Sequence, residues 1–522
     1  MATARPVSRR AFVRFAAFGG AAAVLTACGG AAPVPTEAPK ASAPAPTTAP
    51  AAAPTTAPAT AATAAPAAAA TTAPAAAAST QAPAAAATKP AATGAAPQAA
   101  APATSQTASK ITFQSRGGDA LLKVAQGLVA EYNKAYPKAE VVIDHTNGDH
   151  WQKLQLSLAA GTPPDTYFDA SLRTGGLGWH KGIIEDLEPY LKSDFVESDY
   201  LKEMWLAMTY DGKRISVPYD SGATALMFNI DLFNKAGVPL PDTKKRMTWQ
   251  ELLDKATKLT FDANGKKPGE SGFDPTRIMQ YGMAPSTGAL GQRDYWALTN
   301  GGEVIDKNGK LAIDSQESID GFQFMADLGA KYFVGPSPEY KQANPIGFAN
   351  GNVAMAQDGV WQLGRTNDAK LNWGVAPMPQ SKVPVSYGQY SGLAMTKASK
   401  AKDATWQFMK WTGLGKDGQT YLYKVGSLQP TRKDLISLFV DDTSPPAKQY
   451  RQVFVDELNP DTIKWPGQYQ NSFWLGWGQY VIDAWAPRLD PVLRGKKQFK
   501  EIVADLKAVT QKILDTGEPA QQ

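Results

Sequence analysis

The sequence contains very little of the chemistry on which metal sites and disulfides depend. It has one cysteine and three histidines in 522 residues. A lone thiol excludes a disulfide within the chain and any multi-cysteine metal or iron–sulfur site. The histidines, His145, His150 and His180, are not spaced to hold a metal from one helix face. We therefore expect neither a metal nor a cofactor.

The signatures of several enzyme classes are also missing. There is no His-Glu-x-x-His, no Gly-x-Ser-x-Gly and no phosphate loop ending in Gly-Lys-Ser/Thr. A Gly-x-Gly-x-x-Gly pattern at 413–418 follows a predicted helix at 404–411 instead of a strand, which indicates a helix stop. Asp165 and Asp169 have the chemistry of a glycosidase pair, but acids are abundant in this chain. The sequence predicts a protein that is not an enzyme.

Residues 1–28 have the pattern of an export signal. A basic front with Arg9 and Arg10 precedes an apolar run at 15–27, which is too short to span a bilayer comfortably. The ending Leu-Thr-Ala-Cys28 resembles a bacterial lipobox, which predicts lipid on Cys28 after signal removal. The arginine pair resembles a twin-arginine signal, and a general secretory signal is the alternative. The place of Cys28 in this motif accounts for the presence of a single cysteine in the chain.

Residues 29–108 consist almost entirely of Ala, Pro and Thr and are predicted to form a disordered tether. As a flexible coil this segment would span roughly 50 Å. Residues 1–108 carry six basic side chains and one acid, so they account for the whole net charge of +5. The remaining chain is electrically balanced and gives no reason to expect nucleic acid as a partner.

Residues 109–522 are too many for one hydrophobic core, which predicts two domains. Strands are predicted at 110–113, 141–143 and 166–168, and helices at 120–134 and 151–160. This alternation is typical of an α/β fold with a parallel sheet. His145, Asp169 and Arg173 lie near predicted strand ends, where open α/β folds bind their ligands, and Arg116 lies in the loop after the first strand.

One later passage is predicted to connect the two domains. The pattern indicates a strand at 214–218, a turn at 219–222 and a second strand at 224–228. A strand, turn and strand in succession can cross from one domain to the other.

The segment 348–361, FANGNVAMAQDGVW, combines two turns with a short apolar strand. Asp358 and Trp361 follow that strand and are therefore predicted at the ligand-binding edge of a sheet. The alternative is that Trp361 is a packing residue after a tight turn, which is the more common role of a large aromatic side chain.

An ordered series of motifs resembles the carbohydrate-type extracellular solute-binding proteins of ABC importers, family 1, whose maltodextrin-binding members are the best understood. The motifs are LAAGTPPD (158–165), VPY and FNIDLF (217–233), KAGVPLP (235–241), TWQELLDKA (248–256), NGGEVI (300–305), FANGNVAMAQDGVW (348–361), WGVAPMP (373–379) and GSLQPTR (426–432). The resemblance implies an α/β fold of two lobes built from interleaved segments, hinged by crossing strands, with the ligand in the interlobe cleft. The lobes are predicted at 109–219 with 387–440 and at 220–386 with 441–522.

The resemblance also suggests ligand-binding residues. Trp361 and Trp474 match the tryptophans that stack on sugar rings in maltodextrin binders, and Asp169 and Arg173 match further polar contacts. A glutamate of those relatives is replaced by Gly222, with Asp220 the nearest carboxylate, and an arginine is replaced by Gly478. Further candidates by position are Asp358, Arg116, Trp296, Tyr390 and Arg432, and for Trp296, Tyr390 and Arg432 packing or surface roles are equally open.

These features together predict a lipid-anchored receptor on the outer face of a bacterial cytoplasmic membrane. It would capture a sugar or oligosaccharide as a monomer and deliver it to the transmembrane subunits of an ABC permease. A non-sugar solute, such as a phosphorylated polyol or a polyamine, is one alternative. An extracellular polysaccharide-acting enzyme and a tethered adhesion or sensor protein are others.

Overall fold

The structure is a computed structural model that describes residues 109–519 except 149, 171–174, 192–194, 289, 307–309, 341–344, 427 and 460–474. The predicted signal, Cys28 and the tether lie outside the described residues, so those predictions stay untested. Within the described part, no helix combines the length and the apolar character needed to cross a membrane.

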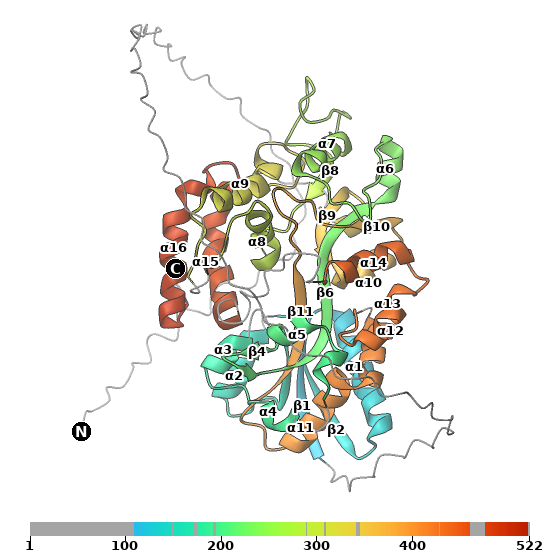
Figure 1. The fold of residues 1–522 in the computed structure, drawn as a ribbon, viewed down its shortest axis with the longest axis vertical. Coiled ribbons are helices and arrows are strands. Elements are labelled where there is room, and N and C mark those ends of the chain that lie inside the picture. Colours follow the sequence, from blue (N-terminus) through green and yellow to red (C-terminus); the bar gives the residue numbers. More distant parts are fainter. Residues whose placement is uncertain are drawn as a thin grey trace, which may run out of the picture. The chain divides into compact units, whose positions relative to one another are not determined.

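One mixed sheet of nine strands organises the described chain (Figure 1). Its order is β2-β1-β3-β11-β6-β9-β8-β7, and β10 also pairs with β6. The strands are β1 Ser109–Arg116, β2 Ala139–Thr146, β3 Thr166–Ala170, β6 Val217–Asn229, β7 Phe261–Asp262, β8 Ile278–Ala284, β9 Val353–Gly359, β10 Trp373–Ala376 and β11 Gly388–Met395. A separate pair is formed by β4 Thr209–Tyr210 and β5 Lys213–Arg214.

The first part of the chain forms the predicted alternation of strands and helices. Strand β1 pairs in parallel with both β2 and β3, and helices α1 and α2 connect them. Parallel strands need such helical connections because the chain must return to the same end of the sheet before each new strand. The parallel βαβ prediction is therefore confirmed, and the ends of β1 and β3 bring Arg116 and Ala170 to one edge.

Strand β6 belongs to both halves of the sheet. Its first part, 217–223, pairs with β11, which in turn pairs with β3. Its second part pairs with β9 from Thr224 to Phe228 and with β10 from Leu226 to Asn229. We refer to β2, β1, β3, β11 and the first part of β6 as the first half-sheet, and to the second part of β6 with β9, β10, β8 and β7 as the second half-sheet. A single strand thus joins two halves that face different helices.

The turn predicted at 219–222 is wrong, because β6 runs without interruption from Val217 to Asn229. The pairing between β6 and β11 is irregular at this point and forms a bulge opposite Ser391 and Gly392. A bulge inserts one residue into a strand and re-aims the neighbouring side chains without ending the pairing. The polar and small residues that suggested a turn therefore mark a bulge within a continuous strand.

Helices cover the two half-sheets separately. Their bounds are α1 Asp119–Ala135, α2 His150–Ala159, α3 Gly176–His180, α4 Glu188–Leu191, α5 Lys202–Ala207, α6 Ile230–Ala236, α7 Trp249–Leu259, α8 Leu290–Thr299, α9 Gln316–Ala330, α10 Leu363–Asp368, α11 Lys402–Met409, α12 Lys416–Gly426, α13 Ile436–Val440, α14 Lys448–Asp456, α15 Leu475–Leu493 and α16 Val503–Thr516. On the first half-sheet, Tyr132 of α1 packs edge-on against Phe408 of α11 at 5.1 Å between ring centroids. On the second, α7 begins with a capping box, in which the side chains of Thr248 and Glu251 each accept a hydrogen bond from the other's backbone N–H.

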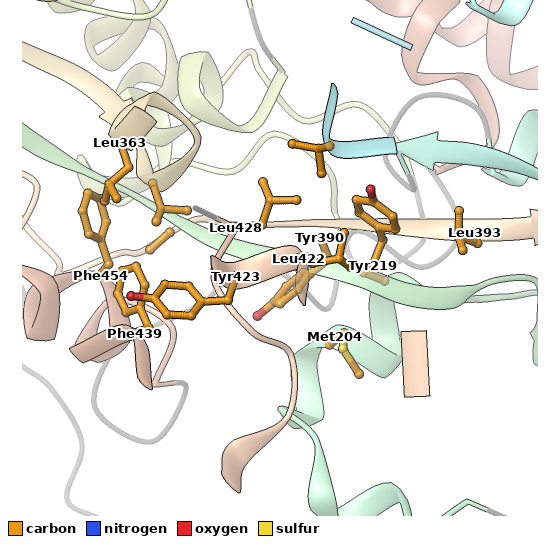
Figure 2. Close-up of a cluster of buried hydrophobic side chains, with 14 of the residues drawn as sticks. Met204, Tyr219, Leu363, Tyr390, Leu393, Leu422, Tyr423, Leu428, Phe439 and Phe454 are labelled. Carbon is orange, nitrogen blue, oxygen red and sulfur yellow. The ribbon is translucent and has the colours of Figure 1, made fainter. Parts of the chain in front are cut away.

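The largest hydrophobic cluster crosses the strand that the half-sheets share. It contains Leu393 of β11, Met227 of β6 and Val353 of β9, all fully buried. Figure 2 shows Tyr390 and Leu393 among side chains that also come from the C-terminal helices, such as Leu422 and Phe454. Burial on both sides of β6 explains the apolar run Ala225–Phe228 in its second part.

We predict that Met227→Ala lowers the free energy of unfolding by about 2–5 kcal/mol, because it removes a fully buried side chain and leaves a cavity in the shared core. The matched control is Met279→Ala in β8, whose side chain is 53% exposed and whose effect should stay within about 0.5 kcal/mol. Urea unfolding followed by circular dichroism measures both. Equal effects at the two positions would contradict the role given to β6.

Candidate functional site

Trp361 lies where the sequence places it, directly after a strand of the sheet. It belongs to the short 3-10 helix η4, Val360–Gln362, which follows the last residue of β9. Its side chain is 37% exposed, and no other tryptophan whose side chain the structure describes is exposed. An indole at this position is open to a partner on part of its surface.

The six-membered ring of the Trp361 indole rests on the backbone of two glycines. A Cβ atom added at Gly359 would overlap this ring, and one added at Gly222 would lie 3.5 Å from its Cε3 atom. The glycines thus allow the indole to lie close to β9 and β6. Any larger residue at Gly359 would displace the ring.

The packing around position 222 explains why this residue is a glycine. A Cβ atom there would lie 2.5 Å from Cγ1 of Val360, in addition to its approach to Trp361. No room is left for the glutamate that maltodextrin binders carry in this region. The presence of glycine at position 222, in place of that glutamate, is therefore linked to the position of the Trp361 indole.

Asp358 places a carboxylate beside the indole. The Gly359 N–H donates to its Oδ1 at 2.9 Å. Burial raises the pKa of Asp358 to about 6, and the hydrogen bond from Gly359 together with the nearby side chains of Trp361 and Gln362 limits the rise. At neutral pH the group is mostly charged and is a strong hydrogen-bond acceptor.

Asp220 adds a second carboxylate two residues before Gly222 on the same strand. Its Oδ1 accepts a hydrogen bond from the Ser391 N–H at 3.2 Å, across the bulge. Burial raises the pKa of the Asp220 carboxyl, while hydrogen bonds from Ser391 and the positive charge of Arg116 partly offset the rise. The bulge therefore holds a half-buried carboxyl group two residues from Gly222, against which the Trp361 indole rests.

Arg116 reaches this region from the end of β1. Its guanidinium carbon lies 4.8 Å from the centroid of the Phe168 ring, within the range of a cation–π contact. Phe168 also packs edge-on against Tyr219, with 4.9 Å between ring centroids. Side chains from β1, β3 and β6 thus form a cluster on the first half-sheet, and the charge of Arg116 acts on Asp220.

Two predicted site residues are packing residues instead. Trp296 is fully buried, and its Nε1 donates to Oε1 of Gln357 at 3.0 Å. Tyr390 is 2% exposed and lies in the shared core (Figure 2). Neither side chain offers surface to a ligand, which favours the packing role that the sequence left open for both. A sequence motif gives the position of a residue in the chain. It does not show how completely neighbouring side chains bury that residue in the fold.

Arg432 is likewise engaged by its own surroundings. It forms hydrogen bonds with both carboxylate oxygens of Asp434, with the Tyr200 hydroxyl and with the carbonyl oxygen of Leu414. These bonds connect the loop after α12 to the segment around Tyr200. Arg432 thus braces these segments against each other, and its ligand contact stays a prediction.

Three candidates cannot be located. Arg173 and Trp474 lie outside the described residues, and for Asp169 only the backbone, in β3, is described. Their predicted roles remain predictions. Among the residues that the structure does describe, no group of three or more His, Cys, Asp or Glu side chains could hold a metal ion.

Sequence reasoning missed the parts of the site that carry no polar group. Phe168 and Gly359 are not among the predicted site residues, although Phe168 contacts Arg116 and Gly359 lies against the Trp361 ring. A signal was present, since glycines next to an aromatic residue at a strand end are typical of a ring that needs close access to the backbone.

Comparison with known proteins identifies the family. Residues 127–452 match the family model described as bacterial extracellular solute-binding protein. The maltotriose-binding protein of Pyrococcus abyssi is 25% identical over 296 residues, which cover 56% of this chain and 59% of that protein. The arabinooligosaccharide-binding protein of Bacillus subtilis is 24% identical over 326 residues, which cover 59% of this chain and 70% of that protein. The match thus spans less than two thirds of the maltotriose-binding relative.

The fold matches solved structures over a larger share of the chain. An ABC substrate-binding protein of Listeria monocytogenes, solved with cycloalternan, aligns with a TM-score of 0.65 at 22% identity and covers 78% of this chain and 99% of that one. The predicted α/β fold of two lobes is confirmed. The lobe bounds predicted from the sequence stay a prediction, and we propose that the first half-sheet with its helices forms the first lobe and the second half-sheet with its helices the second lobe.

We predict that Asp358→Asn changes how stability depends on pH. The pKa of Asp358 in the folded state, about 6, lies above the ordinary value of 3.8. Its contribution to stability is thus present below about pH 4 and is lost as pH rises through about 6. Asparagine has no such loss, so the stability of the variant relative to the parent should rise by about 1–3 kcal/mol from pH 4 to pH 7.

Thermal unfolding of both proteins at half-unit pH intervals tests this prediction. Comparison with the parent removes the contribution of other buried acids, such as Asp294 and Glu457, whose pKa values are also raised by burial. A stability difference that does not vary with pH would contradict the prediction.

Proposed function

Because the chain belongs to the family of bacterial extracellular solute-binding proteins, we propose that it is the solute-binding receptor of an ABC importer and that its solute is a sugar or oligosaccharide. The observation that carries the proposal is the exposed Trp361 indole held on two glycines beside Asp358. The names of the maltotriose- and arabinooligosaccharide-binding relatives support the choice of solute.

The chemistry of the site suits a neutral polyhydroxylated ring. A pyranose exposes a face of C–H groups that buries well against an indole, and its hydroxyls need fixed acceptors at the edge. Asp358 and Asp220 supply such acceptors, and Arg116 supplies donors. Trp474, Asp169 and Arg173 are proposed as further contacts on the strength of the sequence motifs alone.

Charge separates this proposal from its two alternatives. A phosphorylated polyol would bring its phosphate towards Asp358 and Asp220, and like charges at short range disfavour binding. A polyamine would suit the carboxylates but would meet the guanidinium of Arg116, whose charge acts on Asp220. A neutral sugar avoids both conflicts.

We also propose that the protein is anchored by lipid on Cys28 and hands its solute to permease subunits at the membrane. The tether of 29–108 would let the receptor move between the two. Solute capture would occur by closure of the lobes about the crossing strand β6, with the solute held between them.

Equilibrium binding tests the solute. Calorimetry with maltotriose, arabinotriose, glucose, glycerol 3-phosphate and spermidine should give binding with at least one of the three sugars. Trp361→Ala should weaken that binding by about 1–3 kcal/mol, because it removes a stacking surface while leaving the fold intact. The matched control is Trp406→Ala, a half-buried tryptophan on α11 that packs against Tyr190 and should leave affinity unchanged. Binding of the phosphate or the amine alone would refute the sugar proposal and keep a transport role.

Metabolic labelling with a radioactive fatty acid tests the anchor. The parent protein, expressed in a bacterial host with lipoprotein processing, should incorporate label and sediment with membranes. Cys28→Ser should abolish both and appear in the soluble extracellular or periplasmic fraction. Label that persists in the serine variant would rule out Cys28 as the lipid site.

A further inference from the structure

The two lobes touch at a place that the chain does not cross. Helix α15 contacts α3 (Figure 1). Helix α3 follows β3 of the first lobe, whereas α15 packs on α9 and α16, where Trp485 and Phe322 share a core. The contact between α15 and α3 is thus a non-covalent connection between lobes that are joined covalently elsewhere, as at β6.

Tyr480 of α15 forms the centre of this contact. Its half-buried side chain packs against a cluster of the first lobe that includes Trp151 and Leu177. Burial raises the pKa of Tyr480, and the charge of Lys181 partly offsets this rise. A side chain of the second lobe therefore packs into a hydrophobic cluster of the first.

An ion pair lies beside the tyrosine. The Lys181 ammonium, directly after α3, is 3.5 Å from the Glu518 carboxylate, directly after α16. Both side chains are partly exposed, so salt screens the pair and its contribution is small. The ion pair is nevertheless a second, independent contact between the lobes.

We propose that Tyr480, supported by the pair of Lys181 and Glu518, is a latch that holds the two lobes closed in the protein without solute. Separation of the lobes about β6 breaks these contacts, whereas the continuous strand and the core around it can stay paired. The latch therefore raises the fraction of closed molecules. Because apparent affinity scales with the fraction of the binding-competent state, the latch also tightens solute binding.

The effect of the latch on solute affinity rests on the proposed function. The measurement of the distance between the lobes, which tests the latch, does not. Spin labels at Leu156→Cys on α2 and Met279→Cys on β8, both exposed positions on different lobes, report the distance between the lobes in a Cys28→Ser background. Double electron–electron resonance without any solute should show a longer distance distribution in Tyr480→Ala than in the parent. The matched control, Tyr332→Ala, removes a half-buried tyrosine of the second lobe away from the contact and should leave the distribution unchanged.

Glu518→Lys provides a second variant that should fold in any case, because the side chain is 68% exposed. It sets two positive groups opposite each other and should lengthen the distance in the same direction, more at low salt than at high salt. Distributions of Tyr480→Ala and Glu518→Lys that both coincide with the parent would overturn the latch.

Affinity supplies the second readout, with maltotriose as the probe. Tyr480→Ala should raise its Kd about fivefold to tenfold, the range expected for losing one packed aromatic contact. Unchanged affinity together with unchanged distances refutes the latch. If the parent fails to bind any sugar, the proposed solute is wrong, and the spin-label distances still decide whether the latch exists.

Discussion

The continuous pairing of β6 with strands on both of its halves is the constraint on which the rest of the structure depends. Its thirteen residues pair first with β11 and then with β9 and β10. One strand therefore fixes the position of both lobes at their junction, and it places the bulge at Asp220 and the glycine at 222 beside the end of β9. The site is assembled at this junction because both lobes contribute strands to it.

The same constraint explains why the indole of Trp361 is exposed in a chain that buries most of its tryptophans. Gly222 and Gly359 leave a flat backbone surface, and Val360 fills the space beneath. The indole can then rest on the strands without entering the core. Asp358 and Asp220 lie on the two strands that form this surface, so a hydroxylated ring stacked on the indole would find acceptors at its edge.

Sequence patterns predicted what depends on neighbours in the chain. The parallel βαβ units, the capping box at Thr248 and the strand-end location of Trp361 follow from local periodicity and turn chemistry. Contacts between distant segments decided the rest. Trp296 is buried because Trp249, Phe324 and the distant Gln357 surround it. The segment 219–222 stays extended because β11 pairs with it. The sequence of one strand does not show which other strand pairs with it.

The most direct test of this account is a crystal structure with the tightest-binding sugar of the panel. The account predicts one sugar ring parallel to the Trp361 indole, with carbon atoms about 4 Å from the ring plane, and hydroxyl oxygens within hydrogen-bond distance of Asp358 or Asp220. A sugar bound elsewhere, with the Trp361 indole still open to solvent, would contradict it.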